Sequence, residues 1–220
     1  MTARTSRKES SVTIRAIAWD IDGTLVDSEP LHHEALVTVC NRWQVDLSDI
    51  PHDRFCGVHM LEVWLSLSHR MPPTLTEQAW HDAIVDYYAD RCRDLEPMFG
   101  AIETIDVLAA SGFAQVCVSN SGRKIVDANM LALGIRERMM FSISLDDVRY
   151  GKPDPEPYAT ACAKLNLRPT QVLAVEDSLT GLRSARAAGL MTAFYSINDA
   201  AHFEADFSVT DLRQLQQIVL

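Results

Sequence analysis

The sequence lacks any long uninterrupted apolar segment, so we expect no membrane span. Residues 1–11 are polar and basic, and no apolar signal-peptide core follows them, so this stretch is expected to be a flexible N-terminal tail. No internal repeat is visible. What remains is ordinary for a globular protein: 220 residues, 47% hydrophobic and 23% charged, which is enough for one domain plus an insertion.

Cysteine and positive charge are both scarce. The five cysteines, an odd number without CxxC spacing, argue against a disulfide framework and for a reducing, cytoplasmic location. Lys and Arg number 20 against 30 Asp and Glu, a formal net charge of −10. Because nucleic-acid affinity comes largely from Lys and Arg, we expect no nucleic-acid partner. A small phosphorylated substrate stays compatible, since local charge at a site can oppose the global sign.

An apolar run over residues 14–19 ends abruptly in Asp20-Ile-Asp22-Gly-Thr24. Short apolar runs bounded by turn residues are typical of buried parallel strands, and chemistry in open α/β sheets collects at the carboxyl ends of such strands. We therefore expect both aspartates at a strand tip, with Gly23 allowing a sharp turn. This Asp-x-Asp-Gly-Thr run resembles motif I of the haloacid dehalogenase-like hydrolases, which are mostly Mg²⁺-dependent phosphatases and phosphomutases.

Short acidic clusters also occur in Ca²⁺ loops, so a Ca²⁺ site or a plain structural turn is an alternative for this motif alone. An EF-hand loop needs alternating oxygen ligands and a distant Glu. Leu25 and Val26 stand where two of those ligands would be required. The preceding apolar run also indicates a strand, so the phosphoryl-transfer interpretation is favoured.

Helical spacing dominates residues 28–95. Ser28 is a plausible N-cap with Pro30 at an early helical position, and Thr74 and Glu77 have the spacing of a capping box. A single helix suffices for an ordinary crossover between parallel strands, and this block is much longer. We therefore expect an inserted all-helical cap domain.

From Glu96 onward, apolar runs alternate with helical patterns, which indicates a parallel, doubly wound, Rossmann-like α/β sheet. The expected strands cover residues 116–118, 141–145, 172–175 and 191–195, and a closing helix is expected over 211–219. The predicted α/β core domain therefore comprises residues 12–27 and 96–220.

Polar residues with chemical potential follow three of these later segments. Ser119 ends one apolar run, Glu176 and Asp177 end another, and Lys152 lies in a loop between them. Taken singly, each has a bland explanation: a turn serine, a solvated lysine, and acids that cap the next helix. In order and spacing they resemble motifs II, III and IV of the same superfamily. Four motifs in order, across nearly the whole chain, favour the functional interpretation.

The chemistry of this set is coherent without the resemblance. A phosphate ester is anionic, so an attacking carboxylate is repelled unless a cation intervenes. Mg²⁺ prefers oxygen ligands, which three acids can supply: Asp20, Glu176 and Asp177. Lys152 adds a charge that neutralises a phosphoryl oxygen and holds Asp20 ionised, while Ser119 and backbone N–H groups beside Gly23 can donate to other oxygens. Phosphoryl transfer needs mainly this positioning and charge neutralisation.

The resemblance assigns roles to these residues. It implies that Asp20 is the nucleophile and forms an aspartyl-phosphate, and that Asp22 is the general acid and base, with its backbone carbonyl on the metal. It implies that Ser119 and Lys152 complete the catalytic set. The implied metal-binding residues are Asp20, Asp22, Glu176 and Asp177, of which Asp177 is the safer ligand and Glu176 a direct or indirect one.

The cap resembles that of the β-phosphoglucomutase and phosphoglycolate phosphatase group. The run from Asp27 to His32 matches the usual start of that cap, and a His at the position of His32 helps relay a proton in the mutase. Gly57-Val-His-Met60 matches the mutase's Gly-Val-Ser-Arg loop, but Met60 replaces the Arg that would contact a second phosphate. The candidate substrate-binding residues are Gly23, Thr24, His32, Gly57, His59 and Asn120; His59 is equally compatible with a surface histidine and Asn120 with a turn residue.

The leading hypothesis is a Mg²⁺-dependent phosphatase that acts on a small phosphomonoester such as a sugar phosphate. A β-phosphoglucomutase-type phosphomutase is the first alternative, and the absence of Arg at Met60 counts against it. A metal-independent haloacid dehalogenase is the second, and Asp22 argues against it because that reaction needs no acid or base there. A non-catalytic binding protein is the third. The sequence does not identify the substrate or the oligomeric state.

Overall fold

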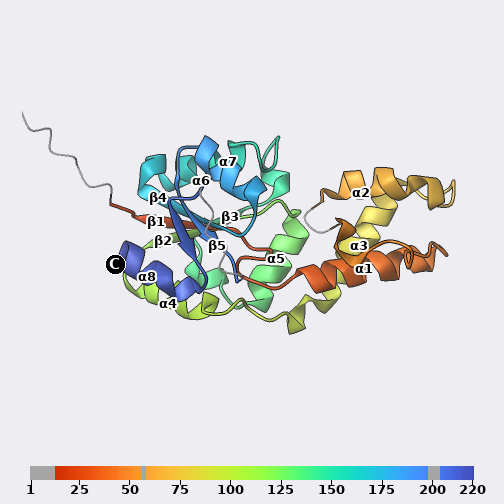
Figure 1. The fold of residues 1–220 in the computed structure, drawn as a ribbon, viewed down its shortest axis with the longest axis horizontal. Helices are drawn as coiled ribbons and strands as arrows, with labels where there is room; N and C mark the ends of the chain where they lie inside the picture. Colours follow the sequence, from red (N-terminus) through yellow and green to blue (C-terminus); the bar gives the residue numbers. More distant parts are fainter. Residues whose placement is uncertain (1–12, 56–57, 198–203) are drawn as a thin grey trace, which may run out of the picture.

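The chain folds around one six-stranded, all-parallel sheet with strand order β3-β2-β1-β4-β5-β6 (Figure 1). The computed structural model describes residues 13–55, 58–197 and 204–220. The strands are β1 (Ala16–Trp19), β2 (Ala114–Val118), β3 (Phe141–Ile143), β4 (Val172–Glu176), β5 (Met191–Tyr195) and β6 (Phe207–Val209). The expected parallel sheet is confirmed, and β6 is an additional short edge strand that the sequence pattern did not indicate.

Helices cover both faces of this sheet. They are α4 (Ala101–Ala110), α5 (Arg123–Ala132), α6 (Glu156–Leu165), α7 (Leu179–Ala187) and α8 (Leu215–Val219). Alternate residues of β1 point to opposite faces, as the strand period requires. Ile17 and Trp19 pack in the core under α4, α5 and α8, and Ala16 and Ala18 pack in the core under α6 and α7. The doubly wound arrangement is therefore confirmed.

A separate group of helices lies between β1 and α4 and stands beside the sheet (Figure 1). It contains α1 (Glu29–Arg42), α2 (Met60–Leu67) and α3 (Glu77–Arg91). These helices share their own apolar cluster, which Ile125 of α5 joins. Short 3-10 turns complete the chain: His52–Phe55, Ser68–Arg70, Cys92–Asp94, Arg136–Arg138, Leu145–Asp147, Pro169–Gln171 and Leu212–Gln214.

The two connections between the helical group and the sheet run side by side. Val26 forms an antiparallel bridge with Pro97, and the Asp27 N–H donates to the Glu96 carbonyl at 3.2 Å. Both connections therefore reach the sheet at the point where β1 ends, next to Asp20 and Asp22.

Two local expectations about helix starts need correction. The capping box at Thr74 and Glu77 is wrong: Thr76 is the N-cap of α3, and its hydroxyl accepts the Ala79 N–H at 3.2 Å. The Leu75 N–H bonds back to Pro72, so a turn leaves Thr74 outside the helix. Ser28 occupies the N-cap position of α1 as expected, but its hydroxyl makes no capping bond.

None of the helices in the described parts of the chain combines the length and the hydrophobicity that crossing a bilayer requires.

Candidate active site

Three carboxylates meet at the carboxyl ends of the two central strands. Asp20 directly follows β1, and its N–H donates to Val175 of β4 at 3.0 Å. Glu176 ends β4 and Asp177 comes next. Carboxylate oxygens of Asp20, Glu176 and Asp177 all lie within 4.8 Å of one another. The pairing of β1 with β4 therefore brings together acids that are more than 150 residues apart in the sequence.

The Lys152 ammonium hydrogen-bonds to groups at the ends of β1, β2 and β4. Its Nζ donates to Asp20 Oδ1 at 2.5 Å, to Glu176 Oε1 at 2.6 Å and to the Val118 carbonyl at the end of β2 at 2.8 Å. These three bonds use all three ammonium donors. Only 3% of the Lys152 side chain is exposed, so its charge acts in a poorly hydrated site. Lys152 thus fixes the position of the Asp20 carboxylate.

One lysine does not balance three buried carboxylates. Burial raises the pKa of Asp20 to about 7 against the lowering effect of Lys152, and the charges of Glu176 and Asp22 add to the rise. Burial, followed by the charge of Asp20, raises the pKa of Asp177 to about 7. These shifts indicate an excess of negative charge. A divalent cation held by these oxygens would relieve it, so the donor set fits a hard metal ion.

Glu176 is enclosed by groups that sequence reasoning missed. The Tyr158 hydroxyl donates to Glu176 Oε1 at 2.5 Å, and the Ser178 hydroxyl donates to Oε2 at 3.3 Å. A Cβ at Gly181 would lie 1.9 Å from Oε2, so only glycine fits there. One feature of the sequence could have pointed to Tyr158. It lies six residues after Lys152, in the first turn of the helix that packs on the sheet. Glu176 therefore anchors Lys152 while remaining close to Asp20 and Asp177.

Two residues that follow Asp22, Gly23 and Thr24, lie against the Asp177 carboxylate. The fully buried Thr24 hydroxyl donates to Asp177 Oδ1 at 3.1 Å. Gly23 has a φ of +82°, and a Cβ there would come within 2.3 Å of Asp177 Oδ2. Leu25 and Val26 are fully buried in the core, where they offer no ligands to a Ca²⁺ loop.

Asp22 lies beside this cluster with its carboxylate fully engaged. Its Oδ1 accepts from the Ser28 hydroxyl at 2.8 Å and the Asn129 amide at 3.1 Å, and His32 Nε2 lies 3.4 Å away. Its Oδ2 accepts from two hydroxyls of the loop after β2, Ser121 at 2.9 Å and Ser119 at 3.2 Å. Burial would raise the pKa of Asp22, but hydrogen bonds and charge from His32, with the serine bonds, lower it below its usual value.

Two further candidates have structural partners. The Asn120 amide donates to the Lys152 carbonyl at 3.0 Å and accepts the Lys152 N–H at 2.7 Å, so it fixes the loop that carries the lysine. His59 Nδ1 accepts the Leu61 N–H at 3.2 Å and caps α2. Gly57 lies outside the described residues.

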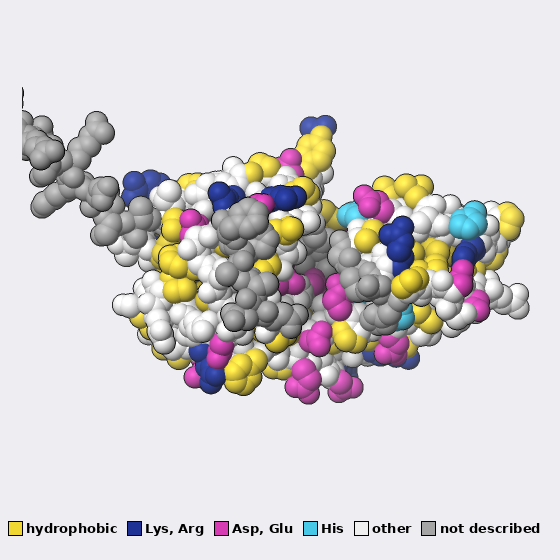
Figure 2. Space-filling view, viewed as in Figure 1, with side chains coloured by type: hydrophobic (Ala, Val, Ile, Leu, Met, Phe, Trp, Pro, Cys, Tyr) yellow, Lys and Arg dark blue, Asp and Glu magenta, His cyan; other side chains and the backbone are white. Residues whose placement is uncertain are grey.

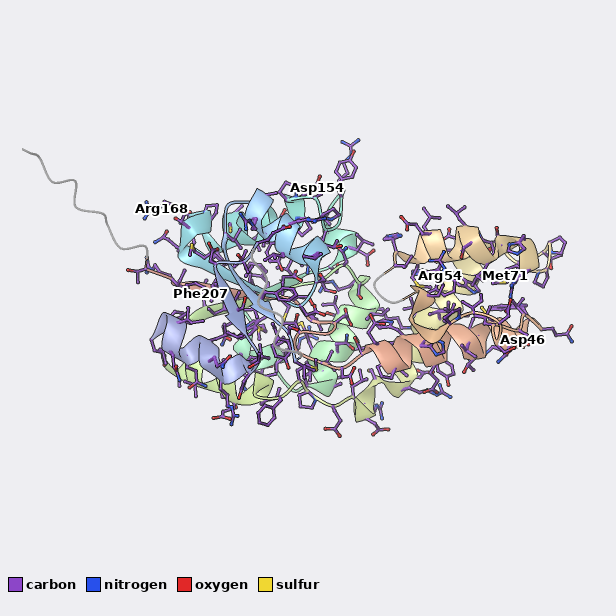
Figure 3. The ribbon with its side chains drawn as sticks, in the orientation of Figure 1. Asp46, Arg54, Met71, Asp154, Arg168 and Phe207 are labelled. Carbon is purple, nitrogen blue, oxygen red and sulfur yellow. The ribbon has the colours of Figure 1, made fainter. Side chains whose placement is uncertain are left out.

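His59 also lines a cavity of about 700 Å³ between α2 and the loop that precedes α6, where Asp154 is labelled in Figure 3. Tyr150, Pro153 and Asp154 line its opposite side. Acidic side chains gather where the helical group meets the sheet domain in Figure 2. This cavity is therefore bounded by both parts of the chain, and its lining includes none of the clustered carboxylates.

Comparisons with known proteins agree with this geometry. The family model of haloacid dehalogenase-like hydrolases matches residues 14–189. Validoxylamine A 7'-phosphate phosphatase of Streptomyces hygroscopicus subsp. limoneus is 30% identical over 205 residues, covering 90% of this chain and 94% of that relative. N-acetylmuramic acid 6-phosphate phosphatase of Pseudomonas aeruginosa is 28% identical over 219 residues, covering 94% and 95%.

Among solved structures, the crystal structure of CbbY from Rhodobacter sphaeroides in complex with phosphate has a TM-score of 0.81 and 25% identity, and the match covers 92% of this chain and 96% of that one. The family model covers all four motif positions, from Asp20 to Asp177, and the two curated relatives described above, which match over nearly their whole length, are named phosphatases. This chain therefore belongs to the haloacid dehalogenase-like hydrolases, as an enzyme that hydrolyses phosphoric monoesters.

Proposed function

We propose that this enzyme is a Mg²⁺-dependent phosphatase of a small phosphomonoester, such as a sugar phosphate, and that it works through an aspartyl-phosphate on Asp20. The observation that carries the proposal is the convergence of Asp20, Asp177 and Lys152 at the ends of adjacent parallel strands. Residues 12–27 and 96–220 form the catalytic core in this proposal, and residues 28–95 form a cap over it. Two relatives named for phosphorylated carbohydrate-like substrates support the substrate class.

The residues that would hold Mg²⁺ are Asp20, Asp177 and the backbone carbonyl of Asp22, with Glu176 adjacent. When bound, the ion would neutralise charge on the phosphoryl oxygens and orient them for displacement. The raised pKa values of Asp20 and Asp177, caused first by burial and then by neighbouring carboxylates, support this assignment, because a bound cation would favour the ionised form of both acids.

In the first step an Asp20 oxygen attacks phosphorus, the bond from phosphorus to the ester oxygen breaks, and the leaving alkoxide takes a proton from Asp22. Lys152 favours the ionised form of Asp20 and orients its carboxylate, because it binds Oδ1 directly. In the second step Asp22 takes a proton from water as that water attacks the aspartyl-phosphate, which releases inorganic phosphate and regenerates Asp20.

Asp22 therefore needs both protonation states. The lowered pKa of Asp22 in this structure favours the ionised form, which is the base of the second step. Serving as the acid of the first step requires a proton on one carboxyl oxygen. With the proton on Oδ2, the Ser119 and Ser121 contacts there would rearrange. Oδ1 would still accept from Ser28 and Asn129. The groups around Asp22 thus control which form is available.

The decisive test is a phosphate-release screen of metabolite phosphomonoesters with Mg²⁺, with Asp20→Asn as the inactive control. Phosphate release from at least one small ester by the unaltered chain alone is the expected result. Isomerisation of a sugar phosphate without net phosphate release would instead favour the phosphomutase alternative, against which the Met60 substitution already argues. No activity on any ester would contradict the proposal.

Removing the metal should stop turnover. With excess chelator we expect phosphate release to fall by at least about 100-fold, because the carboxylate cluster then repels the anionic ester. Adding Mg²⁺ beyond the chelator should restore the rate. Undiminished hydrolysis in chelator would show that the cluster works without a cation, contrary to the proposed metal site.

Tyr158→Phe should lower the phosphatase rate without unfolding the chain. The change removes one hydrogen bond to the buried Glu176 carboxylate, while Lys152 and Ser178 still hold it. A bond to a charged group is worth about 2 kcal/mol, which corresponds to a rate factor of roughly 30, so we expect kcat to fall by up to about 30-fold. Tyr150→Phe, at an exposed tyrosine outside the Glu176 hydrogen bonds described above, is the matched control. Equal losses of kcat in Tyr158→Phe and Tyr150→Phe would argue against a role of Tyr158 in anchoring Glu176.

A further inference from the structure

A buried hydrogen-bonded chain connects the helical segment to Asp22. The Tyr88 hydroxyl on α3 donates to Asn129 Oδ1 on α5 at 2.8 Å. Asn129 Nδ2 in turn donates to Asp22 Oδ1 at 3.1 Å. Tyr88 and Asn129 are both fully buried. The chain runs between the two parts of the molecule, because α3 packs on α5, which also borders the sheet (Figure 1).

The partners of the two Asp22 oxygens come from different places. Ser121 and Ser119, which contact Oδ2, both belong to the loop after β2. Oδ1 is contacted by Ser28 and His32 at the start of the helical segment, and by Asn129. The His32 ring stacks on Tyr88 with centroids 4.3 Å apart. Every Oδ1 partner is therefore part of the helical segment or is joined to it by Tyr88.

An amide suits position 129 better than any other side chain. A phenol that donates needs an acceptor, and a carboxylate needs a donor, and one amide supplies both. A carboxylate at this position would repel Asp22, and an apolar side chain would leave the Tyr88 hydroxyl unpaired in the core. The neighbouring α5 residues Ile125, Val126 and Met130 are apolar and buried, so packing alone does not call for a polar group here.

We propose that Asn129, held by Tyr88, is a positioning residue for the acid–base action of Asp22, so that the helical cap sets where the catalytic carboxyl lies. This inference rests on the proposed phosphatase function. The pair acts on proton delivery to the leaving oxygen through the Asp22 carboxylate, and the hydrogen bonds of Tyr88 and Asn129 described above involve none of the carboxylates of Asp20, Glu176 and Asp177. Removing Asn129 or the Tyr88 hydroxyl should therefore slow hydrolysis most for esters whose leaving group most needs a proton.

The test compares two esters by kcat/KM with Mg²⁺ present. An alkyl phosphomonoester such as β-glycerophosphate has a poor leaving group that needs protonation, and p-nitrophenyl phosphate has a good one that does not. The kcat/KM value reports only the steps up to departure of the leaving group, so the later attack of water does not enter. For Asn129→Leu we expect a loss of about 100-fold on the alkyl ester and less than about threefold on the aryl ester.

Tyr88→Phe keeps the ring that stacks on His32 and removes only the hydroxyl, so it should show the same selectivity with a smaller loss. This variant also serves where Asn129→Leu fails to fold. Tyr87→Phe, on the same helix with its hydroxyl directed to Glu34, is the matched control and should not discriminate between the esters.

Equal losses on the two esters, or no loss in either variant, would overturn the inference while leaving the phosphatase assignment intact. If the wild-type chain does not hydrolyse β-glycerophosphate, an alkyl ester from the metabolite screen takes its place. A wild-type chain that releases phosphate from no ester of that screen would overturn the proposed function, and this inference with it.

Discussion

Asp20→Asn should eliminate phosphate release, with a fall in kcat of at least about 10⁴-fold, because an amide cannot accept the phosphoryl group from the ester. No neighbouring carboxylate substitutes for it. Glu176 is engaged by Lys152 and Tyr158, and Asp177 by Thr24. The change is measured as phosphate release under saturating Mg²⁺ and ester.

The same substitution should leave the fold intact. Asp20 sits among like charges, and burial raises its pKa to about 7, so its ionised form is destabilising above that pH. Removing the charge relieves repulsion with Glu176 and Asp177, although Lys152 loses one partner. We expect a melting temperature at pH 8 equal to or above that of the unaltered chain. Retained phosphate release by a folded variant would contradict the assignment of Asp20 as nucleophile.

Mass-spectrometric detection of phosphate on the chain distinguishes the nucleophile from a mere metal ligand. A short acid quench during turnover should trap one phosphoryl group on the unaltered chain, in the peptide that contains Asp20, and none on Asp20→Asn. Phosphate release without a trapped phosphoryl group, combined with loss of Mg²⁺ binding in the variant, would indicate that Asp20 acts only through the metal.

The strand-end chemistry was predictable from the sequence because it follows from short-range patterns. Apolar runs that end in Asp20, Ser119 and Glu176 indicate parallel strands, and parallel strands place their carboxyl ends at one edge. The convergence of residues 20, 119 and 176 then follows from topology, whereas Lys152 reaches them from a loop. The edge strand β6 escaped notice because its apolar alternation covers only three residues, Phe207–Val209, which is too short a run to indicate a strand.

The residues that surround Asp22 and Glu176 were not predictable by the same reasoning. Tyr88, Asn129 and Tyr158 each lie inside a helix, where a polar aromatic or an amide fits the helical pattern without marking a site. Their roles depend on which helix faces pack together, and that is a tertiary property. Ser28 illustrates the limit most clearly: its position as an N-cap was correct, yet its hydroxyl turns to Asp22 because a buried carboxylate is the stronger acceptor.

Gly181→Ala should be the most disruptive single-methyl change at the site. The new Cβ would lie 1.9 Å from Glu176 Oε2, 2.0 Å from its Cδ and 2.1 Å from Oε1. Gly181 lies in α7 and the Glu176 carboxylate is buried, so neither the helix backbone nor the carboxylate can shift without disturbing its neighbours. Relief requires Glu176 to leave its place and break its bonds to Lys152 and Tyr158. We expect a loss of unfolding free energy of about 3 kcal/mol or more.

Phosphatase activity should fall along with stability, because Lys152 then loses one of its two carboxylate partners and Asp20 is less firmly held. Gly122→Ala is the matched control: its Cβ would meet only Asp146 Oδ2, at an ordinary 3.6 Å, and it should cost little. Denaturant unfolding of Gly181→Ala and Gly122→Ala measures the loss of unfolding free energy in each variant.

A second substitution separates the steric cause from a helix-wide effect. The double variant Gly181→Ala with Glu176→Ala has neither the clash nor the buried carboxylate that the clash would displace. Its unfolding free energy should therefore recover substantially relative to Gly181→Ala alone. Activity should stay low, because the Val118 carbonyl is then the one partner besides Asp20 that the Lys152 ammonium keeps of the three described above. If the double variant were no more stable than Gly181→Ala, the contact between residues 176 and 181 would not be what requires glycine in this helix.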